Sequence, residues 1–222
     1  KLPDNCIVIA AGNRVTDKSV AYKMPKALCN RMTHLELKPE IDDWKKWAIP
    51  FGIDSRIVGF LNYMSSKLDA FDPSNDDVAF PTPRTWQMVD TWLKKTKDVD
   101  TALPLIAGTI GLGATIEFKT WVQVFHKLPN IKEILEGKET NVPKDPDVLY
   151  ALSAALVSAI GRENGTAQKK ALSNVLTYAM NMPAEFSTLT VKDLVMVKDI
   201  RQKVLTLPEF INWSRKHKNF IM

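Results

Sequence analysis

The stretch "FPTPRTWQMVDTWLKK", residues 80–95, carries the start, the apolar face and the end of one amphipathic helix. Thr82 is a good N-cap residue, and Pro83 falls at the first helical position, where a missing N–H costs no hydrogen bond. An apolar stripe follows at helical spacing, and two lysines close the last turn: Trp86, Val89, Leu93, Lys94 and Lys95. The stretch therefore predicts a helix that buries one face.

Two further helices are predicted before this stretch. The segment "PEIDDWKKWAIP", residues 39–50, places acidic side chains in its first turn and an apolar face after them: Ile41, Trp44 and Ala48. Asp54 is the expected N-cap of the second helix, whose buried face is expected to hold five residues: Ile57, Phe60, Leu61, Met64 and Leu68. The segment "FDPSNDD" at 71–77 then breaks the chain.

Helical spacing also dominates the sequence after residue 100. It predicts seven helices, at Ala102 to Ile110, Thr115 to Lys127, Ile131 to Gly137, Pro146 to Arg162, Ala167 to Met180, Val191 to Lys203 and Pro208 to Lys216. No repeat of fixed period connects them. The C-terminal half is therefore expected to be a helical array.

The N-terminal segment has a different pattern. Residues 6–11 of "CIVIAAGNRVTDKSV" form a short apolar run rich in β-branched residues, which indicates a buried strand, and polar residues follow it: Asn13, Arg14 and Asp17. A short helical stretch is expected at Pro25 to Asn30. In "THLELK", Leu35 and Leu37 alternate with polar neighbours as in a second strand. Two strands do not form a stable sheet alone, so Lys1 is expected to lie inside a domain.

The expected fold class is therefore mainly α, with a small two-strand α/β part ahead of the helices. Three parts are predicted: the end of an α/β core at 1–38, a helical subdomain at 39–99 and a helical extension at 100–222.

Composition is that of an ordinary globular protein, with 222 residues, 45% hydrophobic and 25% charged. No apolar run approaches the roughly 18 to 20 residues of a membrane span, and residues 1–5 lack the apolar segment of a signal peptide. Cys6 and Cys29 lack CxxC spacing, so two reduced thiols and a cytoplasmic location are expected. The net charge of +5 is compatible with an acidic partner but identifies no site.

Three polar residues are candidates for a functional site. Arg84 stands in the first turn of the helix predicted at 83–95, where the positive end of the helix dipole disfavours a cation and favours a phosphate. Asn13 follows an apolar run, at the end of a strand where ligands of α/β sheets bind. Each also has a plain structural interpretation. Arg84 can keep its head in water, Asn13 can bond its own backbone, and Arg31 can form a surface ion pair.

Other motifs point away from metal or phosphate-loop chemistry. The glycines of "GTIGLGA", residues 108–114, lack the GK followed by Ser or Thr of a phosphate-binding loop, and a closely packed helix junction is the expected structure. His34, His126 and His217 are isolated, and no metal-ligand spacing is present, so no metal site is predicted.

Taken together, "VIAAGNRVTDKSVAYKMPKALCNRMTHLEL" and "FPTPRTW" resemble the C-terminal part of an AAA+ ATPase module of the MoxR-like, dynein-related type. In that family a strand ending in Asn is sensor 1, a stretch similar to "MPKALCNR" carries the arginine finger, and "TPR" at the start of a lid helix carries sensor 2. These motifs match Asn13, Arg31 and Arg84, and the resemblance covers about Ile7 to Leu93.

The family's Walker A loop and Walker B acidic pair do not occur in this sequence. The resemblance therefore implies a fragment that neither binds ATP tightly nor hydrolyses it alone, whereas a full-length parent would bind ATP and Mg²⁺. In that parent, Asn13 would orient the attacking water, Arg84 would contact the phosphates, and Arg31 would reach the ATP of a neighbouring subunit. A contact of this kind implies a ring, with a hexamer expected, which remodels a protein substrate.

Two other functions are compatible with the sequence. The first is a non-enzymatic helical module that binds a protein partner through the segment beyond Ala102. The second is a nucleic-acid motor, for which salt-dependent DNA binding is the first test.

Overall fold

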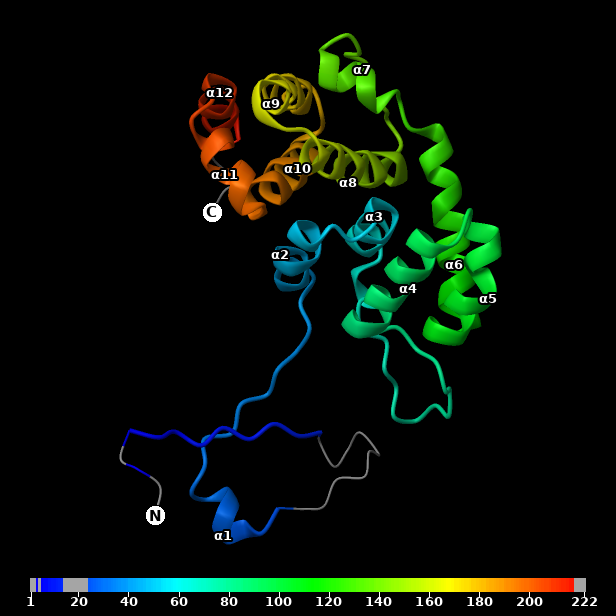
Figure 1. Ribbon diagram of the computed structural model, residues 1–222, viewed down its shortest axis with the longest axis vertical. Helices are drawn as coiled ribbons and strands as arrows, with labels where there is room; N and C mark the ends of the chain where they lie inside the picture. Colours follow the sequence, from blue (N-terminus) through cyan, green and yellow to red (C-terminus); the bar gives the residue numbers. More distant parts are fainter. Residues whose placement is uncertain (1–2, 4, 14–23, 218–222) are drawn as a thin grey trace. The chain divides into compact units, whose positions relative to one another are not determined.

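The computed structural model describes Pro3, residues 5–13 and residues 24–217, and the chain divides into two units (Figure 1). The N-terminal unit comprises Lys1–Lys38 and Phe71–Asp77, and the helical unit comprises Pro39–Ala70 and Val78–Met222. Within the described ranges, no helix is long and apolar enough to cross a membrane.

Among its described residues, the N-terminal unit has one short helix, α1 (Lys26–Cys29), where a helical stretch was predicted, and no strand. The prediction of a two-strand α/β part is therefore wrong, whereas the mainly helical character is confirmed. The apolar side chains of both expected strands are exposed, at 88% for Ile7 and 91% for Leu37.

The physical reason is that a strand needs a neighbouring backbone. The backbone hydrogen bonds between described residues include no ladder that joins residues 6–11 to residues 33–37. Without such a partner, an apolar run of strand type has neither paired N–H groups nor a covered face. Arg14 and Asp17, predicted at the exit of the first strand, lie outside the described residues.

The helical unit is a continuous succession of short and medium helices, drawn from cyan to red in Figure 1. Those before residue 130 are α2 (Ile41–Phe51), α3 (Ser55–Tyr63), η2 (Ser65–Lys67), α4 (Pro83–Lys95), α5 (Val99–Ile110), α6 (Leu112–Val122) and η3 (Gln123–Lys127). They are followed by α7 (Ile131–Glu136), α8 (Pro146–Arg162), α9 (Gly165–Ala179), α10 (Ala184–Met196), α11 (Lys198–Leu205) and α12 (Pro208–Lys216).

Local capping explains where several helices begin. The Asp54 carboxylate accepts a hydrogen bond from the Arg56 amide at 2.9 Å, which confirms Asp54 as the N-cap of α3. That helix ends at Tyr63, earlier than expected, but Leu68 is still buried in the loop that follows. Helix α4 has the predicted bounds and buries the predicted stripe: Trp86, Val89 and Leu93.

The helix predicted at Val191 to Lys203 is wrong in its bounds, because two helices occupy this region. Helix α10 begins at Ala184, and a break at Val197 separates it from α11. Hydroxyl residues obscured the early start of α10. Thr188 donates to the Ala184 carbonyl at 2.7 Å and Thr190 to the Phe186 carbonyl at 2.8 Å, so their polar groups are satisfied inside the helix.

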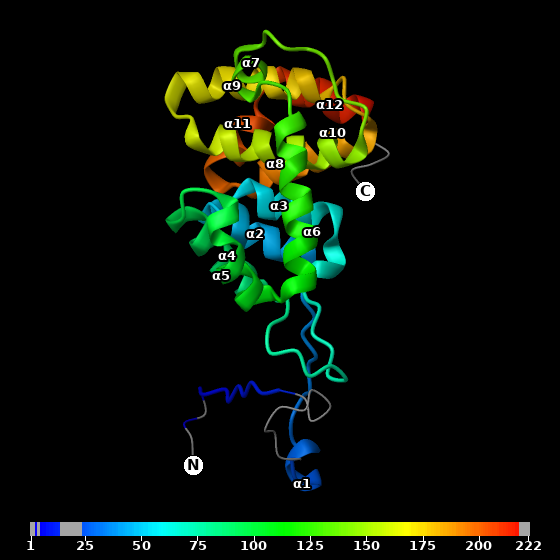
Figure 2. The same cartoon turned by 90° about the vertical axis from the view of Figure 1, so that its right-hand side faces the viewer.

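Two hydrophobic clusters form the core of the helical unit, and α8 belongs to both. Val148, Ala151 and Ala154 of α8 join the cluster built from α2 to α6, whereas Leu149, Leu152 and Leu156 join the cluster shared with α9 to α12. Figures 1 and 2 both show α8 between α3 on one side and α9 on the other. A helix that is apolar all round is expected in such a central position.

The junction between α5 and α6 requires glycine at one position. Gly111 has φ +80°, and a Cβ placed there would approach the Ala79 carbonyl oxygen to 2.7 Å. The expected helix junction is confirmed at this residue. The expected close packing is wrong for Gly108 and Gly113, since a Cβ on either would meet nothing within 4 Å.

Candidate functional site

Arg84 lies on the second residue of α4, and the start of this helix is closed by its own side chains. The Thr85 amide donates to Thr82 Oγ1 at 3.2 Å, and the Thr82 amide donates to Thr85 Oγ1 at 2.7 Å. This reciprocal arrangement is a capping box, although Thr replaces the usual Glu or Gln at the third helical position. The two threonines fix the backbone that carries Arg84.

The Arg84 side chain is exposed and has no hydrogen bond or ion pair with any residue that the structure describes. The first turn of α4 contains no acidic residue that could offset the guanidinium charge. The charge therefore adds to the positive end of the helix dipole, which makes this helix start favourable for an anion. An arginine there can donate two parallel hydrogen bonds to a phosphate or carboxylate.

Helix α4 is held firmly behind this arginine. The Trp86 side chain is fully buried, and its Nε1 donates to the Lys67 carbonyl at 2.7 Å. Its ring contacts those of Phe60 and Phe118, with centroids 5.5 and 5.7 Å apart. A displacement of the backbone at Arg84 would therefore move α4 together with the core residues packed against it, and not only the first turn of the helix.

A buried carboxylate on α4, missed by the sequence analysis, ties this helix to the start of α3. Asp90 accepts from the Asp54 amide at 2.8 Å and from Lys94 Nζ at 2.7 Å. At Asp54, burial acts to raise the pKa of the carboxyl, but the Arg56 guanidinium and amide hold it below its usual value. The spacing could have revealed Asp90, because it stands four residues after Trp86 on the buried face.

Asn13 and Arg31, the other two predicted site residues, lie in the N-terminal unit. Both are exposed, and no hydrogen bond or ion pair between them occurs in the described part of the chain. Arg31 follows α1 in a turn, where its amide donates to the Leu28 carbonyl at 3.0 Å. Asn13 ends a segment without regular structure. The structure therefore does not bring these two residues together.

A second buried charge pair was also missed. Lys45 Nζ lies 2.9 Å from Asp193 Oδ1, and the two side chains are only 2% and 1% exposed. This pair joins α2 to α10, and Asn62 of α3 contacts the other carboxylate oxygen at 3.5 Å. Lys45 stands next to Trp44 on the buried face of α2. A charged residue beside an apolar stripe was the feature of the sequence that could have indicated a buried pair.

Metal-ligating side chains do not gather in the described residues, which contain no group of three or more His, Cys, Asp or Glu that could hold an ion. Comparisons of the chain with protein families, with characterised proteins and with solved structures found no match.

Proposed function

We propose that this chain is the C-terminal portion of an AAA+ ATPase of the MoxR-like type, which couples ATP hydrolysis to the remodelling of a protein partner. The observation that carries the proposal is the exposed guanidinium of Arg84 on the first turn of α4, with no partner among the described residues. A cation in that position is unfavourable by about 0.3–1 kcal/mol unless an anion compensates it. A nucleotide phosphate is the anion that the resemblance suggests.

In this proposal Arg84 donates its N–H groups to phosphate oxygens and transmits their presence to α4. Because Trp86 anchors α4 in the core, the orientation of the helical unit would depend on the bound nucleotide. Asn13 would orient the attacking water. Arg31 would reach the nucleotide of a neighbouring subunit, in a ring expected to be a hexamer.

The chain offers a phosphate of ATP one contact, at Arg84, and offers Mg²⁺ none that we identify. Arg84 is suited to a phosphate, but the sequence contains neither the glycine-rich loop with its lysine nor the acidic pair that holds Mg²⁺. In the proposal those groups belong to a longer parent protein. The chain alone is expected to bind nucleotide weakly and to have no ATPase activity.

The experiment compares two variants of a longer protein that contains the Walker motifs before the residue numbered Lys1 here. Arg84→Ala is expected to weaken ATP binding about 10- to 100-fold, the effect of one charge-assisted hydrogen-bonding group. Arg201→Ala, which removes another exposed arginine on α11, is the matched control and should leave binding unchanged. Equal nucleotide affinity in the two variants would reject the role of Arg84.

The trans contact has a separate test. Arg31→Ala in the assembled longer protein is expected to abolish ATP hydrolysis and to keep ATP binding, because its target lies on a neighbour. Unchanged turnover would reject this assignment. An open reading frame that begins near Lys1, without Walker motifs, would reject the ATPase proposal as a whole.

A non-enzymatic interaction module is the second candidate, and exposed aromatic side chains favour it. Trp47 and Phe51 of α2 stack with ring centroids 4.9 Å apart while remaining 40% and 54% exposed. Such rings are enriched at protein interfaces. The Trp47→Ser variant separates the two functions. If the wild type binds its partner without nucleotide and Trp47→Ser loses this binding, the interaction module is supported. If the wild type binds its partner only with ATP, the ATPase is supported.

A further inference from the structure

A stripe of hydroxyl and ammonium groups runs along the outside of α9. Its side chains recur every three or four residues and, apart from the half-buried Ser173, are exposed: Thr166, Lys169, Lys170, Ser173 and Thr177. These residues form the α9 face. Helix α9 contains no acidic residue, and its N-terminus has no side-chain cap. The α9 face therefore combines positive charge with neutral hydrogen-bonding groups.

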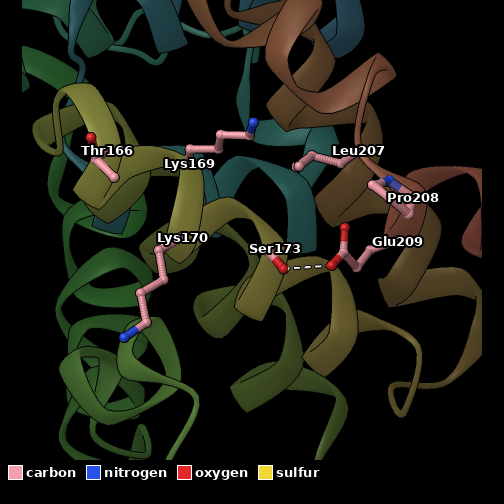
Figure 3. Close-up of a pocket in the computed structure, with 7 residues that line it drawn as sticks. All are labelled: Thr166, Lys169, Lys170, Ser173, Leu207, Pro208 and Glu209. Carbon is pink, nitrogen blue, oxygen red and sulfur yellow. Dashed lines mark hydrogen bonds between the residues drawn. The ribbon is translucent and has the colours of Figure 1, made fainter.

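The two lysines of the α9 face have no counter-charge of their own. Lys169 and Lys170 form no ion pair with any residue that the structure describes. Figure 3 shows them leaving α9 in different directions, Lys169 toward Leu207 and Lys170 away from it, so their charges are spread across the face. Glu209 adjoins the face, where its carboxylate accepts from Ser173 Oγ at 2.6 Å.

Helix α7, which packs against α9, brings further ammonium groups to this side of the molecule (Figure 1). The pKa of Glu136 is lowered first by its hydrogen bond with Lys138, and also by the charges of Lys132 and Lys170, so these lysines lie near one another. Glu136 pairs with Lys138 at 2.6 Å, whereas Lys132 forms no ion pair within the described ranges.

Helix α11 adds a lysine at the other end of the stripe. Lys203 Nζ donates to Gln168 Oε1 at 2.5 Å, which holds this exposed lysine beside the first turns of α9. The ammonium groups on and around α9 are those of Lys132, Lys138, Lys169, Lys170 and Lys203, and the carboxylates are those of Glu133, Glu136 and Glu209. The balance is positive, which suits an acidic partner.

We propose that the α9 face, together with Lys132 and Lys203, binds the phosphate backbone of double-stranded DNA without sequence specificity. This surface is independent of the nucleotide contact proposed at Arg84, which lies on α4. Lysine and hydroxyl side chains are among those that contact DNA phosphates in proteins. From Thr166 to Thr177 the helix rises about 16 Å, over which a parallel duplex presents about ten phosphates on its two strands.

The composition of the α9 face favours a duplex over other acidic partners. Single strands are bound by stacking their bases on aromatic rings, and none of the five side chains is aromatic. Helices that lie on a membrane insert Trp, Phe or Leu, and protein interfaces have an apolar centre. The α9 face has no large apolar side chain for either purpose.

The test titrates a fluorescein-labelled duplex of about 20 base pairs with the full chain and follows fluorescence anisotropy at several NaCl concentrations. Each lysine that neutralises a phosphate contributes about −0.9 to the slope of log K against log[NaCl], so contacts from the four proposed lysines give a slope of about −3.6. A duplex of unrelated sequence should bind equally well. Absence of binding at about 50 mM NaCl, or an affinity independent of salt, would overturn the proposal.

Two double variants locate the contact. Lys169→Gln with Lys170→Gln is expected to weaken binding at least about tenfold at about 50 mM NaCl and to reduce the slope by about 1.8. Lys95→Gln with Lys97→Gln removes the same charge from exposed lysines at and after the end of α4, and its affinity should stay within about twofold of wild type. Circular dichroism verifies that both variants are folded. Equal losses in the two would indicate attraction by net charge alone and would overturn the assignment.

Two further titrations test other partners. A single strand of the same length should bind more weakly than the duplex, and tighter binding of the single strand would refute the choice of a duplex. Vesicles of phosphatidylserine should sediment little of the chain. Strong sedimentation that Lys169→Gln with Lys170→Gln abolishes, in a chain that does not bind the duplex, would identify a membrane contact and overturn the proposal.

Discussion

The buried pair of Lys45 and Asp193 leads to a quantitative prediction for the substitution Lys45→Met. Methionine has a similar length and can fill the space, so the change removes the charge and leaves little cavity. Asp193 would keep only the Asn62 amide at 3.5 Å, since its 2.9 Å contact with the ammonium group is lost. A carboxylate 1% exposed would then lie in the core without a counter-charge.

The expected loss is about 3–5 kcal/mol in the free energy of unfolding at pH 7, the range for breaking a buried pair by removing one partner. This is a large part of the total, since most domains are stable by about 5–15 kcal/mol. Replacing both partners, as in Lys45→Met with Asp193→Leu, should restore much of the loss because no charge remains buried.

Urea unfolding followed by tryptophan fluorescence and by circular dichroism measures these free energies. The control is Lys46→Met, which breaks the 2.6 Å contact between Lys46 and Asp43, where both side chains are more than half exposed. It should leave the unfolding midpoint unchanged, because exposed pairs contribute little. If Lys45→Met loses no more stability than Lys46→Met, the stabilising role of the buried pair is wrong.

The same variant should show a characteristic pH dependence. Burial raises the pKa of Asp193, and the Lys45 ammonium group opposes this rise. In Lys45→Met, burial acts with less opposition, so the folded carboxyl binds its proton more tightly than the unfolded one, whose pKa is about 3.9. The free energy of unfolding of the variant should therefore fall as the pH rises above about 4. The difference in stability between the variant and the wild type should be larger at pH 7 than at about pH 4.

Two other predictions concern a glycine pair and a tyrosine. Gly111→Ala should destabilise the protein by more than about 1 kcal/mol, because the φ of Gly111 is +80° and the new Cβ would lie 2.7 Å from the Ala79 carbonyl oxygen. Gly113→Ala in α6 should instead stabilise the protein by about 0.5–1 kcal/mol, because its Cβ would meet nothing within 4 Å. Thermal unfolding compares the two, and equal effects would contradict the argument. Burial raises the pKa of Tyr178 to about 12. The folded state therefore keeps this proton longer than the unfolded chain, and stability should fall between about pH 10 and 12. In Tyr178→Phe this part of the fall should be absent, and an identical alkaline profile in the variant would refute it.

The sequence predicted α4 correctly because every feature that defines this helix is local. The cap at Thr82, the proline after it and the stripe from Trp86 to Leu93 all lie within 13 residues, and each favours the same structure. The two predicted strands depended on a partner elsewhere, which residues 6–11 and 33–37 do not provide for each other. An apolar run indicates that a segment can be buried, but it does not indicate which segment covers it.

Charges in unexpected places were visible in the sequence, but their partners were not. Lys45 and Asp193 are 148 residues apart, and Glu209 meets Ser173 across 36 residues, so no local spacing connects them. A charge on an apolar stripe indicates only that some partner exists. Finding the partner required the packing of α10 against α2 and of α12 against α9.

These charged side chains differ in whether other residues of the fold compensate their charge, and that difference separates structural from functional roles. Lys45 pairs with Asp193 and with Asp42, and Asp193 also accepts from Asn62, so the burial of Lys45 and Asp193 needs no ligand. Glu209 is half satisfied: one carboxylate oxygen accepts from Ser173, and the other is buried with no hydrogen-bond partner among the described residues. Arg84 has no compensation among the described residues, and it stands where the helix dipole opposes it. An exposed cation in the first helical turn costs only about 0.3–1 kcal/mol, and the phosphate contact that we propose for Arg84 would offset that cost.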